Sequence, residues 1–393
     1  MKYILSFIFS FYCCFTFAQN LNLDPNLTLS EEFRYFMNEG AYSGQEQFFP
    51  SYSITPELTL NWGESNNQLV FKGFFRHDKD SRRTHVDARE FYIQKSKGNW
   101  DLSIGYQQIY WGVAESNHLV DIINQNDAVE DAFGNTKLGQ PLIKYTLATN
   151  KFGTFNLIYL PIHRKLLFPG EKGRFRFPFV LGEDFITYEK NSSTLKKDFA
   201  MRWNHYFGIL DIGINHFYGN GREPFFNLGS LTPSAFYPII NQTGLDLQLT
   251  IDAVLLKFEG IYRSSNFQNF FANVSGLEYT FSNINGAGLD IGIVAEYSYD
   301  DRGNLSVNSL QNDIFSGIRI DWNDMNGSNI LFGVLSDIQY NTKSISIDAT
   351  RRIKENYRIS IEGLYFINID SEELLLPFFS QDHYVKLEIS QFF

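Results

Sequence analysis

The chain has 393 residues, a formal net charge of −11 and an aromatic content of 17%, with 39 Phe and 22 Tyr. The acidic balance argues against nucleic acid as a partner, and the length would allow two or three soluble domains. Mean hydropathy is slightly negative, although a soluble protein with so many aromatic side chains would need a very large core. A membrane β-barrel explains both properties, because lipid-facing aromatic residues alternate with polar lumen residues.

Residues 1–18 have the pattern of a secretory signal peptide. An apolar stretch over 4–17 follows a positive start, and Ala18 supplies the small residue that a signal peptidase needs. Both cysteines, Cys13 and Cys14, lie in this segment, so a chain cleaved after Ala18 has no thiol chemistry. A retained N-terminal anchor is the alternative.

The rest of the chain alternates apolar and polar residues in segments that read as β-strands. In residues 244–252, for example, Leu245 and Leu247 fall on one face, and Asp246 and Gln248 fall on the other. A soluble sandwich would show the same period. The segment lengths match a tilted strand that crosses a bilayer, and Tyr, Trp and Phe recur near the segment ends as in an interfacial girdle.

We predict eighteen strands, with sixteen or twenty as alternatives because residues 183–190 resemble an extra hairpin arm. The predicted strands are 28–37, 50–62, 67–78, 86–97, 100–110, 141–149, 154–163, 197–207, 209–219, 243–252, 254–263, 272–283, 287–299, 312–322, 329–340, 343–353, 356–369 and 382–393. With both chain ends in the periplasm, the long connections all fall outside: 111–140, 164–196, 220–242, 300–311 and 370–381. The sequence therefore predicts an all-β fold, a transmembrane antiparallel β-barrel formed by residues 19–393 as one domain.

The last strand resembles the signal that the barrel-assembly machinery reads in outer-membrane proteins. The chain ends in Phe393, has Leu387 and Ile389 at alternate positions, and begins this strand with the aromatic Tyr384. The resemblance implies outer-membrane localisation, with outer-membrane lipid, lipopolysaccharide and the assembly machinery as partners. A soluble secreted β protein that happens to end in Phe is the alternative.

The alternation stops at Trp111, where a loop over 111–140 begins. Its apolar residues are spaced as on one face of a short helix: Leu119, Ile122 and Ile123. Asn126 or Asp127 is predicted to cap a second short turn. The apolar face needs a surface to pack on, and the barrel wall is the nearest. Two interpretations stay open: a constriction or plug folded into the lumen, or an outer cap over the mouth.

The candidate constriction residues of this loop are Trp111, Gly112, Glu115, Asn117, Asp121, Asn124 and Asp127. We expect Trp111 and Gly112 to form the corner that starts the loop, because Gly112 can adopt a φ that other residues resist. The polar side chains from Asn117 to Asp127 are expected nearest to any passing solute.

A second outer stretch, 161–178, is basic within an acidic protein. Its cations are Arg164, Lys165, Lys172, Arg174 and Arg176. Three interpretations stay open for them: selection of anionic solutes at the barrel mouth, contact with anionic lipopolysaccharide, or no specific role. The candidate site includes Arg164, Arg174 and Arg176 on the first interpretation.

Enzyme chemistry is poorly supported. The chain has no GxSxG elbow and no phosphate-binding glycine loop. His205 and His216 lie in one predicted hairpin, but pairing places His205 opposite about residue 211, so the two histidines do not meet. His77 and His85 flank a short loop that contains Asp78 and Asp80, and residues of these types can bind a metal ion. We favour a solvated loop without a metal. We predict no catalytic residue, metal or cofactor, and keep a lipid-modifying barrel enzyme as a minor alternative.

One stretch carries a family resemblance. The pattern is a G-x-Q strand, a W-G corner and a D/N-x-x-N-x-x-D segment, followed by a Pro/Arg stretch: Gly105, Gln107, Trp111, Gly112, Asp121, Asn124, Asp127, Pro161, Arg164, Pro169, Gly170 and Arg174. Residues 105–178 thereby resemble porin-like Gram-negative outer-membrane barrels of unknown function, similar in style to alginate and hydrocarbon transporters. That family usually has Pro where this chain has Gln125 or Asn126.

The resemblance implies a barrel with a transport role and names no substrate. We therefore predict a porin-like channel for passive diffusion of small solutes, narrowed by the 111–140 loop. An outer-membrane scaffold or adhesin without conductance is the main alternative.

Overall fold

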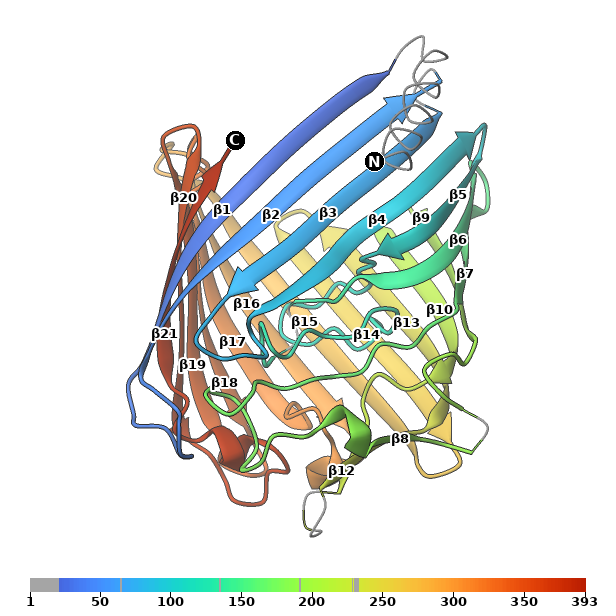
Figure 1. Cartoon of the computed structure of the whole chain (residues 1–393). Helices are drawn as coiled ribbons and strands as arrows, with labels where there is room; N and C mark the ends of the chain where they lie inside the picture. The colour runs from blue at the N-terminus through green and yellow to red at the C-terminus, as the bar shows by residue number, and fades with distance from the viewer. Residues whose placement is uncertain (1–20, 64–65, 134–135, 191, 228, 230–232) are drawn as a thin grey trace, which may run out of the picture.

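The computed structural model shows a closed barrel of eighteen antiparallel strands, which confirms the predicted fold and strand count (Figure 1). The described residues are 21–63, 66–133, 136–190, 192–227, 229 and 233–393. The predicted signal peptide, 1–18, lies outside the described residues. No helix in the described part of the chain has the length and apolar character to cross a membrane.

Every predicted strand has a counterpart at nearly the same position. The barrel strands are β1 (Asn22–Phe36), β2 (Phe48–Trp62), β3 (Asn67–His77), β4 (His85–Lys97), β5 (Trp100–Gln107), β6 (Gln140–Thr149), β7 (Gly153–Leu160), β9 (Asp198–Phe207), β10 (Leu210–Asn220), β13 (Ile239–Ile251), β14 (Val254–Ser265), β15 (Asn269–Ile284), β16 (Leu289–Asp300), β17 (Asn312–Asp321), β18 (Asn329–Asp337), β19 (Lys343–Ile353), β20 (Tyr357–Asn368) and β21 (Tyr384–Phe392). The largest difference is at β1, which begins at Asn22 rather than at residue 28.

Residues 183–190 add no strand to the barrel. They form a short 3-10 turn, η2 (Glu183–Phe185), and β8 (Ile186–Tyr188). With β11 (Phe225–Asn227) and β12 (Ser234–Tyr237), β8 makes a small separate sheet on the long loops, in which β12 runs parallel to β8. Two further 3-10 turns are η3 (Gly303–Leu305) and η4 (Leu376–Phe379).

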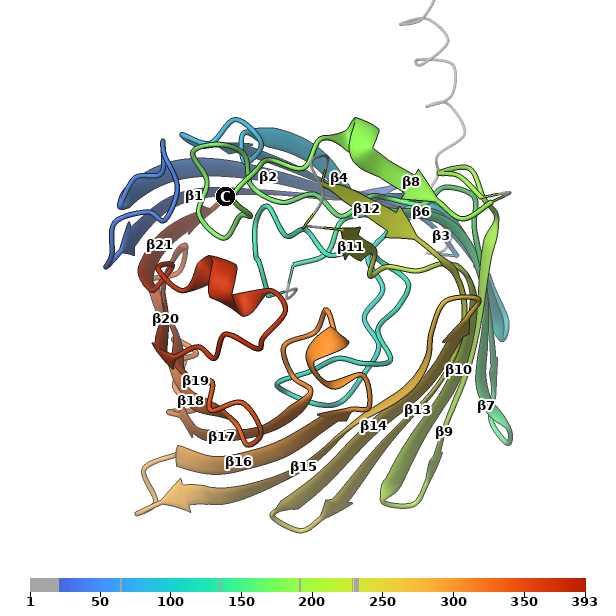
Figure 2. The same cartoon turned by 90° about the horizontal axis from the view of Figure 1, so that it is seen from below.

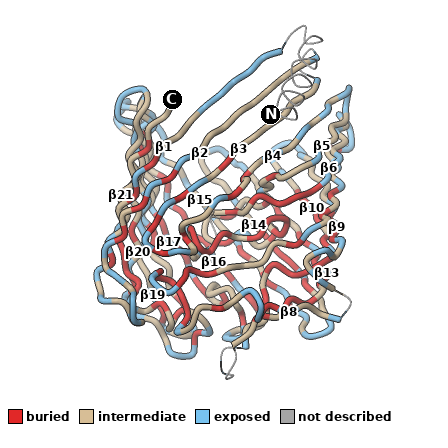
Figure 3. Tube along the Cα trace, in the orientation of Figure 1, coloured by how far each residue is buried: buried red, intermediate tan, exposed pale blue. Residues whose placement is uncertain are grey.

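The two faces of each strand differ as the alternation predicts. On β16, Ile293 and Tyr297 point outward and are 47% and 38% exposed, whereas Glu296 between them is 2% exposed and faces the interior. Exposed and buried residues alternate along the strands (Figure 3), and the exposed ones include many aliphatic and aromatic residues. This outer surface is the one that a bilayer covers.

The longest connections all start from one end of the barrel. Short turns such as 150–152, 208–209 and 354–356 lie at the end that holds the N- and C-terminal ends of the sheet, and we call it the turn end (Figure 1). The long connections, among them 108–139 and 161–197, start from the opposite end, the loop end.

The barrel closes between its first and last strands. Leu27 and Phe393 exchange two backbone hydrogen bonds, of 3.2 and 3.0 Å, and the Ser30 and Ser390 hydroxyls are 2.8 Å apart on the inner face. Residues 22–26 extend past the last strand and pair only with β2. The Leu27 N–H points toward β21, and the direction of the N–H groups alternates along a strand, so the Pro25 nitrogen faces this free edge. Proline has no N–H, so it cannot donate a hydrogen bond to an added strand.

Closure can be tested with cysteines, because Cys13 and Cys14 are the only native ones and precede the predicted cleavage point. Ser30 and Ser390 are directly opposite each other and do not hydrogen-bond through their backbones, and pairs of this type have the shorter Cα–Cα distance. Changing both residues to Cys therefore places two thiols within reach of a disulfide. We expect an internal disulfide under oxidising conditions, seen as a reduction-sensitive shift in electrophoretic mobility. The control pair Ser30→Cys with Ser360→Cys spans two strand spacings and should give no such shift; a shift in the control, or none in the test pair, would contradict the seam.

Candidate functional site

The connection 108–139 between β5 and β6, here called the inner loop, lies inside the ring of strands (Figure 2). Its described residues, 108–133 and 136–139, contain no helix, so the predicted helix around Leu119, Ile122 and Ile123 is wrong. Backbone N–H groups in this region are bound by side chains of the barrel wall instead of by helical carbonyls. The predicted second turn begins at Asp127, whose side-chain oxygen accepts from the Glu130 N–H at 3.4 Å and whose carbonyl accepts from the same N–H at 3.0 Å.

Two carboxylates on the barrel wall hold the first part of the inner loop. Glu259 on β14 is 0% exposed and accepts hydrogen bonds from the backbone N–H groups of Val113, Ala114 and Val120, at 2.6, 2.9 and 3.1 Å. A Cβ added at Gly112, whose φ is +116°, would lie 2.6 Å from the same carboxylate. The predicted corner at Gly112 therefore needs glycine for both its conformation and its close approach to the wall.

Glu296 on β16 repeats this arrangement one step further along the loop. Its carboxylate accepts from the N–H groups of Glu115 and Ser116, both at 2.7 Å, and from the Ser116 hydroxyl at 2.6 Å. Neither Glu259 nor Glu296 forms an ion pair within the described structure. The two side chains thus act mainly as acceptors for the backbone of the loop.

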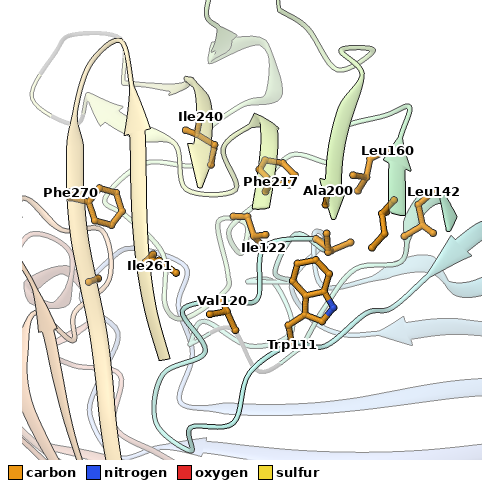
Figure 4. Close-up of a cluster of buried hydrophobic side chains, with 13 residues drawn as sticks. Trp111, Val120, Ile122, Leu142, Leu160, Ala200, Phe217, Ile240, Ile261 and Phe270 are labelled. Carbon is orange, nitrogen blue, oxygen red and sulfur yellow. The ribbon is translucent and has the colours of Figure 1, made fainter. Parts of the chain in front are cut away.

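Apolar packing on the same side of the barrel also fixes this segment. Trp111, Val120, Ile122 and Ile123 are buried against inward-facing residues of β6, β7, β9, β10, β13, β14 and β15 (Figure 4). These wall residues are Leu142, Ile158, Leu160, Ala200, Phe217, Ile240, Ile261, Phe270 and Ala272. The predicted packing of the loop's apolar face on the barrel wall is confirmed, without the helix.

The polar residues of the D-x-x-N-x-x-D segment hold the loop together. The Asn124 side chain accepts from Ile109 N–H at 2.9 Å and donates to the carbonyls of Gln107 and Leu138 at 2.8 and 2.9 Å, joining the two limbs of the loop. Asp121 pairs with Lys137 at 3.3 Å. Burial raises the pKa of the Asp121 carboxyl, and Lys137 opposes that shift.

Asp127 fixes the far end of the loop to β4. Its carboxylate lies 2.7 Å from Arg89 and 3.6 Å from His85. Burial alone would raise the pKa of Asp127, but the nearby His85 and Arg89 side chains outweigh burial and lower it to about 2. Asp121, Asn124 and Asp127 are therefore joined to the protein itself, and the structure does not place them at an open passage.

The edge of the inner loop toward β17 and β19 is more open. Glu115 is paired with Arg319 of β17 at 2.6 Å, and side-chain exposures of 27% and 36% show that this pair is in contact with solvent. The Asn117 amide oxygen accepts from Asn308 of the outer loop 301–311 at 3.1 Å. Asp348 of β19 is exposed on the inner face and within electrostatic range of Glu115.

Residues 164–182, here called the strap, include most of the basic stretch 161–178. The strap lies along the loop end over β1 to β6 (Figure 2). Arg174 is buried, lies 2.6 Å from Asp382 and donates to the carbonyls of Asn38 and Glu46. Arg176 is buried and donates to three carbonyls, at 2.8 to 3.3 Å. Arg164 pairs with Asp87 at 2.7 Å. We assign Arg174 and Arg176 to fixing the strap, because their donors are used within the protein.

Within the loop 78–84, Asp78 and Asp80 are buried rather than solvated, which corrects the expectation from the sequence for these two residues. Asp78 binds Arg83 at 2.6 Å, and Asp80 accepts from the N–H groups of Gly170 and Arg82 at 2.9 and 3.0 Å. Among the described residues, no group of three or more His, Cys, Asp or Glu is placed to hold a metal ion. His205 pairs with Ile212 and His216 with Met201, so the two histidines stay apart as expected.

Neither Glu259 nor Glu296 is among the site residues predicted from the sequence. The only signal was an acidic residue at an inward position of a strand. That signal is shared with Asp246 and Glu362, which pair with cations instead.

No protein-family model and no curated protein matches the chain. Solved structures with the same fold include OccK8 (OprE) of Pseudomonas aeruginosa, at a TM-score of 0.56 and 10% identity over 95% of this chain and 98% of that one. A BenF-like porin from Pseudomonas fluorescens Pf-5 matches with 0.56 and 7% over 96% and 99%.

The Escherichia coli protein Wzi, described as an outer-membrane, carbohydrate-binding β-barrel involved in group 1 capsule assembly, matches with a TM-score of 0.55 and 11% identity over 93% of this chain and 84% of that one. At these identities the likeness shows the fold, which is that of outer-membrane porins.

Replacing Glu259 with Ala should release the inner loop. Three buried N–H groups would lose their acceptor, at a cost of roughly 1–3 kcal/mol for each group left unsatisfied. We expect protease added to the folded barrel to cut within 112–121 in this variant. Glu278→Ala is the matched control, because Glu278 lies on the neighbouring strand and its ion pairs with described residues are those with Lys257 and Arg319; equal cleavage in both variants would contradict the anchoring role.

Proposed function

We propose that this protein is an outer-membrane, porin-like channel for passive diffusion of small solutes, narrowed by the inner loop. Export through a signal peptide at 1–18 and insertion by the barrel-assembly machinery through Tyr384–Phe393 belong to the same proposal. Outer-membrane lipid and lipopolysaccharide are the expected surroundings. No catalytic role is proposed.

The observation that carries this proposal is the fixed position of the inner loop. Glu259, Glu296 and an apolar sector of the wall hold it on the side of β6 to β16. On the opposite side, Ser346 and Asp348 of β19 face inward and are exposed. A loop whose first part is held on this side, and whose far end is fixed to β3 and β4 through Glu130 and Asp127, reduces the cross-section of a wet lumen without requiring closure.

Deleting residues 117–133 should raise single-channel conductance in planar bilayers, because it removes the part of the inner loop that fills the lumen. The measurement compares the deletion with the full chain in the same salt. Unchanged conductance would contradict the constriction, whereas absence of conductance in both proteins would contradict the channel itself.

A second candidate is a surface barrel with a closed mouth that binds carbohydrate, or serves as a scaffold or adhesin, without conducting. It is favoured by an aromatic cluster at the loop end, where the strap meets the β20–β21 connection and both ends of the β1–β2 connection. Its buried members are Phe36, Phe49, Ala128, Phe168, Phe175, Phe177, Phe366, Leu376, Phe379 and Tyr384. The printed description of Wzi as a carbohydrate-binding barrel supports this class.

The double variant Arg174→Ala with Asp382→Ala separates the two candidates. It removes both members of the buried pair, so no unpaired charge remains, and it loosens the strap. If the mouth is closed, only the variant should conduct. If the channel is open, the full chain should conduct, and the variant should have nearly the same conductance. Lys165→Ala is the control, since Lys165 pairs with the exposed Glu183 at 3.2 Å.

A further inference from the structure

The inner loop leaves a cavity of about 640 Å³ on its side facing the turn end, here called the recess. Residues 109–113 of the loop form one boundary, and β6, β7, β9, β10 and β13 form the wall. Asn150 and Tyr206, next to two turns, mark the end where the recess opens. A volume of this size lies within the range of small-molecule sites.

Strand pairing arranges the polar side chains of the recess in levels. Asn204 lies opposite Thr154, and the next level inward has Arg202 opposite Asn156. Arg202 binds Asp246 through two contacts of 2.7 Å, and its guanidinium lies 5.2 Å from the centre of the Trp111 ring. The Arg202 charge is therefore neutralised by Asp246, and its side chain is fixed between that carboxylate and the loop.

Lys144 occupies the next level, opposite Ile158 and beside the apolar contact of the loop. Within the described structure Lys144 has no carboxylate at ion-pair distance, and Asp101 and Glu90 act on it only at longer range. The indole N–H of Trp111 and the amide of Asn204 likewise make no hydrogen bond to a described residue. The recess thus has an unpaired cation at its inner end and free donors from the Trp111 indole and, two levels nearer the mouth, from the Asn204 amide.

The remaining charge of the recess, Asp211, lies at the open end opposite Tyr206. Strand pairing places Lys144 opposite Ile158, Ile158 opposite Ala200, and Ala200 opposite Phe217 of β10, so these residues lie at one level. Six residues of strand between Asp211 and Phe217 correspond to about 20 Å. The recess is therefore positive at its inner end and negative at its mouth.

We propose that the recess binds small, oxygen-rich organic anions. The carboxylate of such a solute would accept from Lys144 and the Trp111 indole, and its hydroxyl groups would meet the amides of Asn156 and Asn204. The neutral Arg202–Asp246 pair lines the middle without competing for the anion. This names a solute class for the proposed channel and rests on that function, but the binding itself does not require conduction.

The test is isothermal titration of the folded full chain in detergent with gluconate and with sorbitol, a neutral polyol of the same carbon number. A charge-assisted hydrogen bond predicts that gluconate binds about tenfold more tightly than sorbitol. Equal affinities, or no binding of gluconate, would overturn the proposal.

Lys144→Met should remove the preference for gluconate, and Lys144→Arg should retain it. The matched control is Lys72→Met, because Lys72 is also on the inner wall but is paired with Glu57 at 2.9 Å; gluconate affinity should not change in this variant. A barrel that binds gluconate and conducts nothing contradicts the channel alone. A conducting barrel whose gluconate affinity is unchanged in Lys144→Met contradicts the recess alone.

Discussion

The structure depends on one constraint: a polar backbone group at membrane depth must find a partner inside the protein, because lipid offers none. The strands satisfy it by closing the sheet between β1 and β21. The inner loop has an irregular backbone and cannot use a ladder of this kind. Glu259 and Glu296 meet the requirement by giving buried carboxylate oxygens to five N–H groups and one hydroxyl of the loop.

The alternation of apolar and polar residues with a period of two is a local property of each segment. For this reason the barrel could be predicted from the sequence. Each apolar face lies in one short segment, so the pattern of residues 244–252 was enough to predict what became β13. The corner at Gly112 was also readable, because it interrupts the pattern. Its second requirement, close approach to Glu259, was not, since the partner lies on a strand more than a hundred residues later.

The errors have the same origin. Leu119, Ile122 and Ile123 have helical spacing, but the surrounding wall binds the loop through both side chains and backbone, and this outweighs a weak helical preference. Arg174 appeared free within a basic stretch because Asp382, its partner, is remote in sequence. Asp80 appeared solvated for the same reason, since Gly170 of the strap covers it. A charge with a distant partner has no local signature.

The inner loop also divides the lumen into sectors with different roles. Charges on β14 and β16, such as Glu259 and Glu296, face the loop and fix its position, so their substitution acts on the loop. Charges on β19, such as Asp348, face the more open part of the lumen, so under the proposed channel function their substitution would act on the solute. An inward-facing charge thus has a different role in each sector of the lumen. The packing of the inner loop determines to which sector a strand belongs.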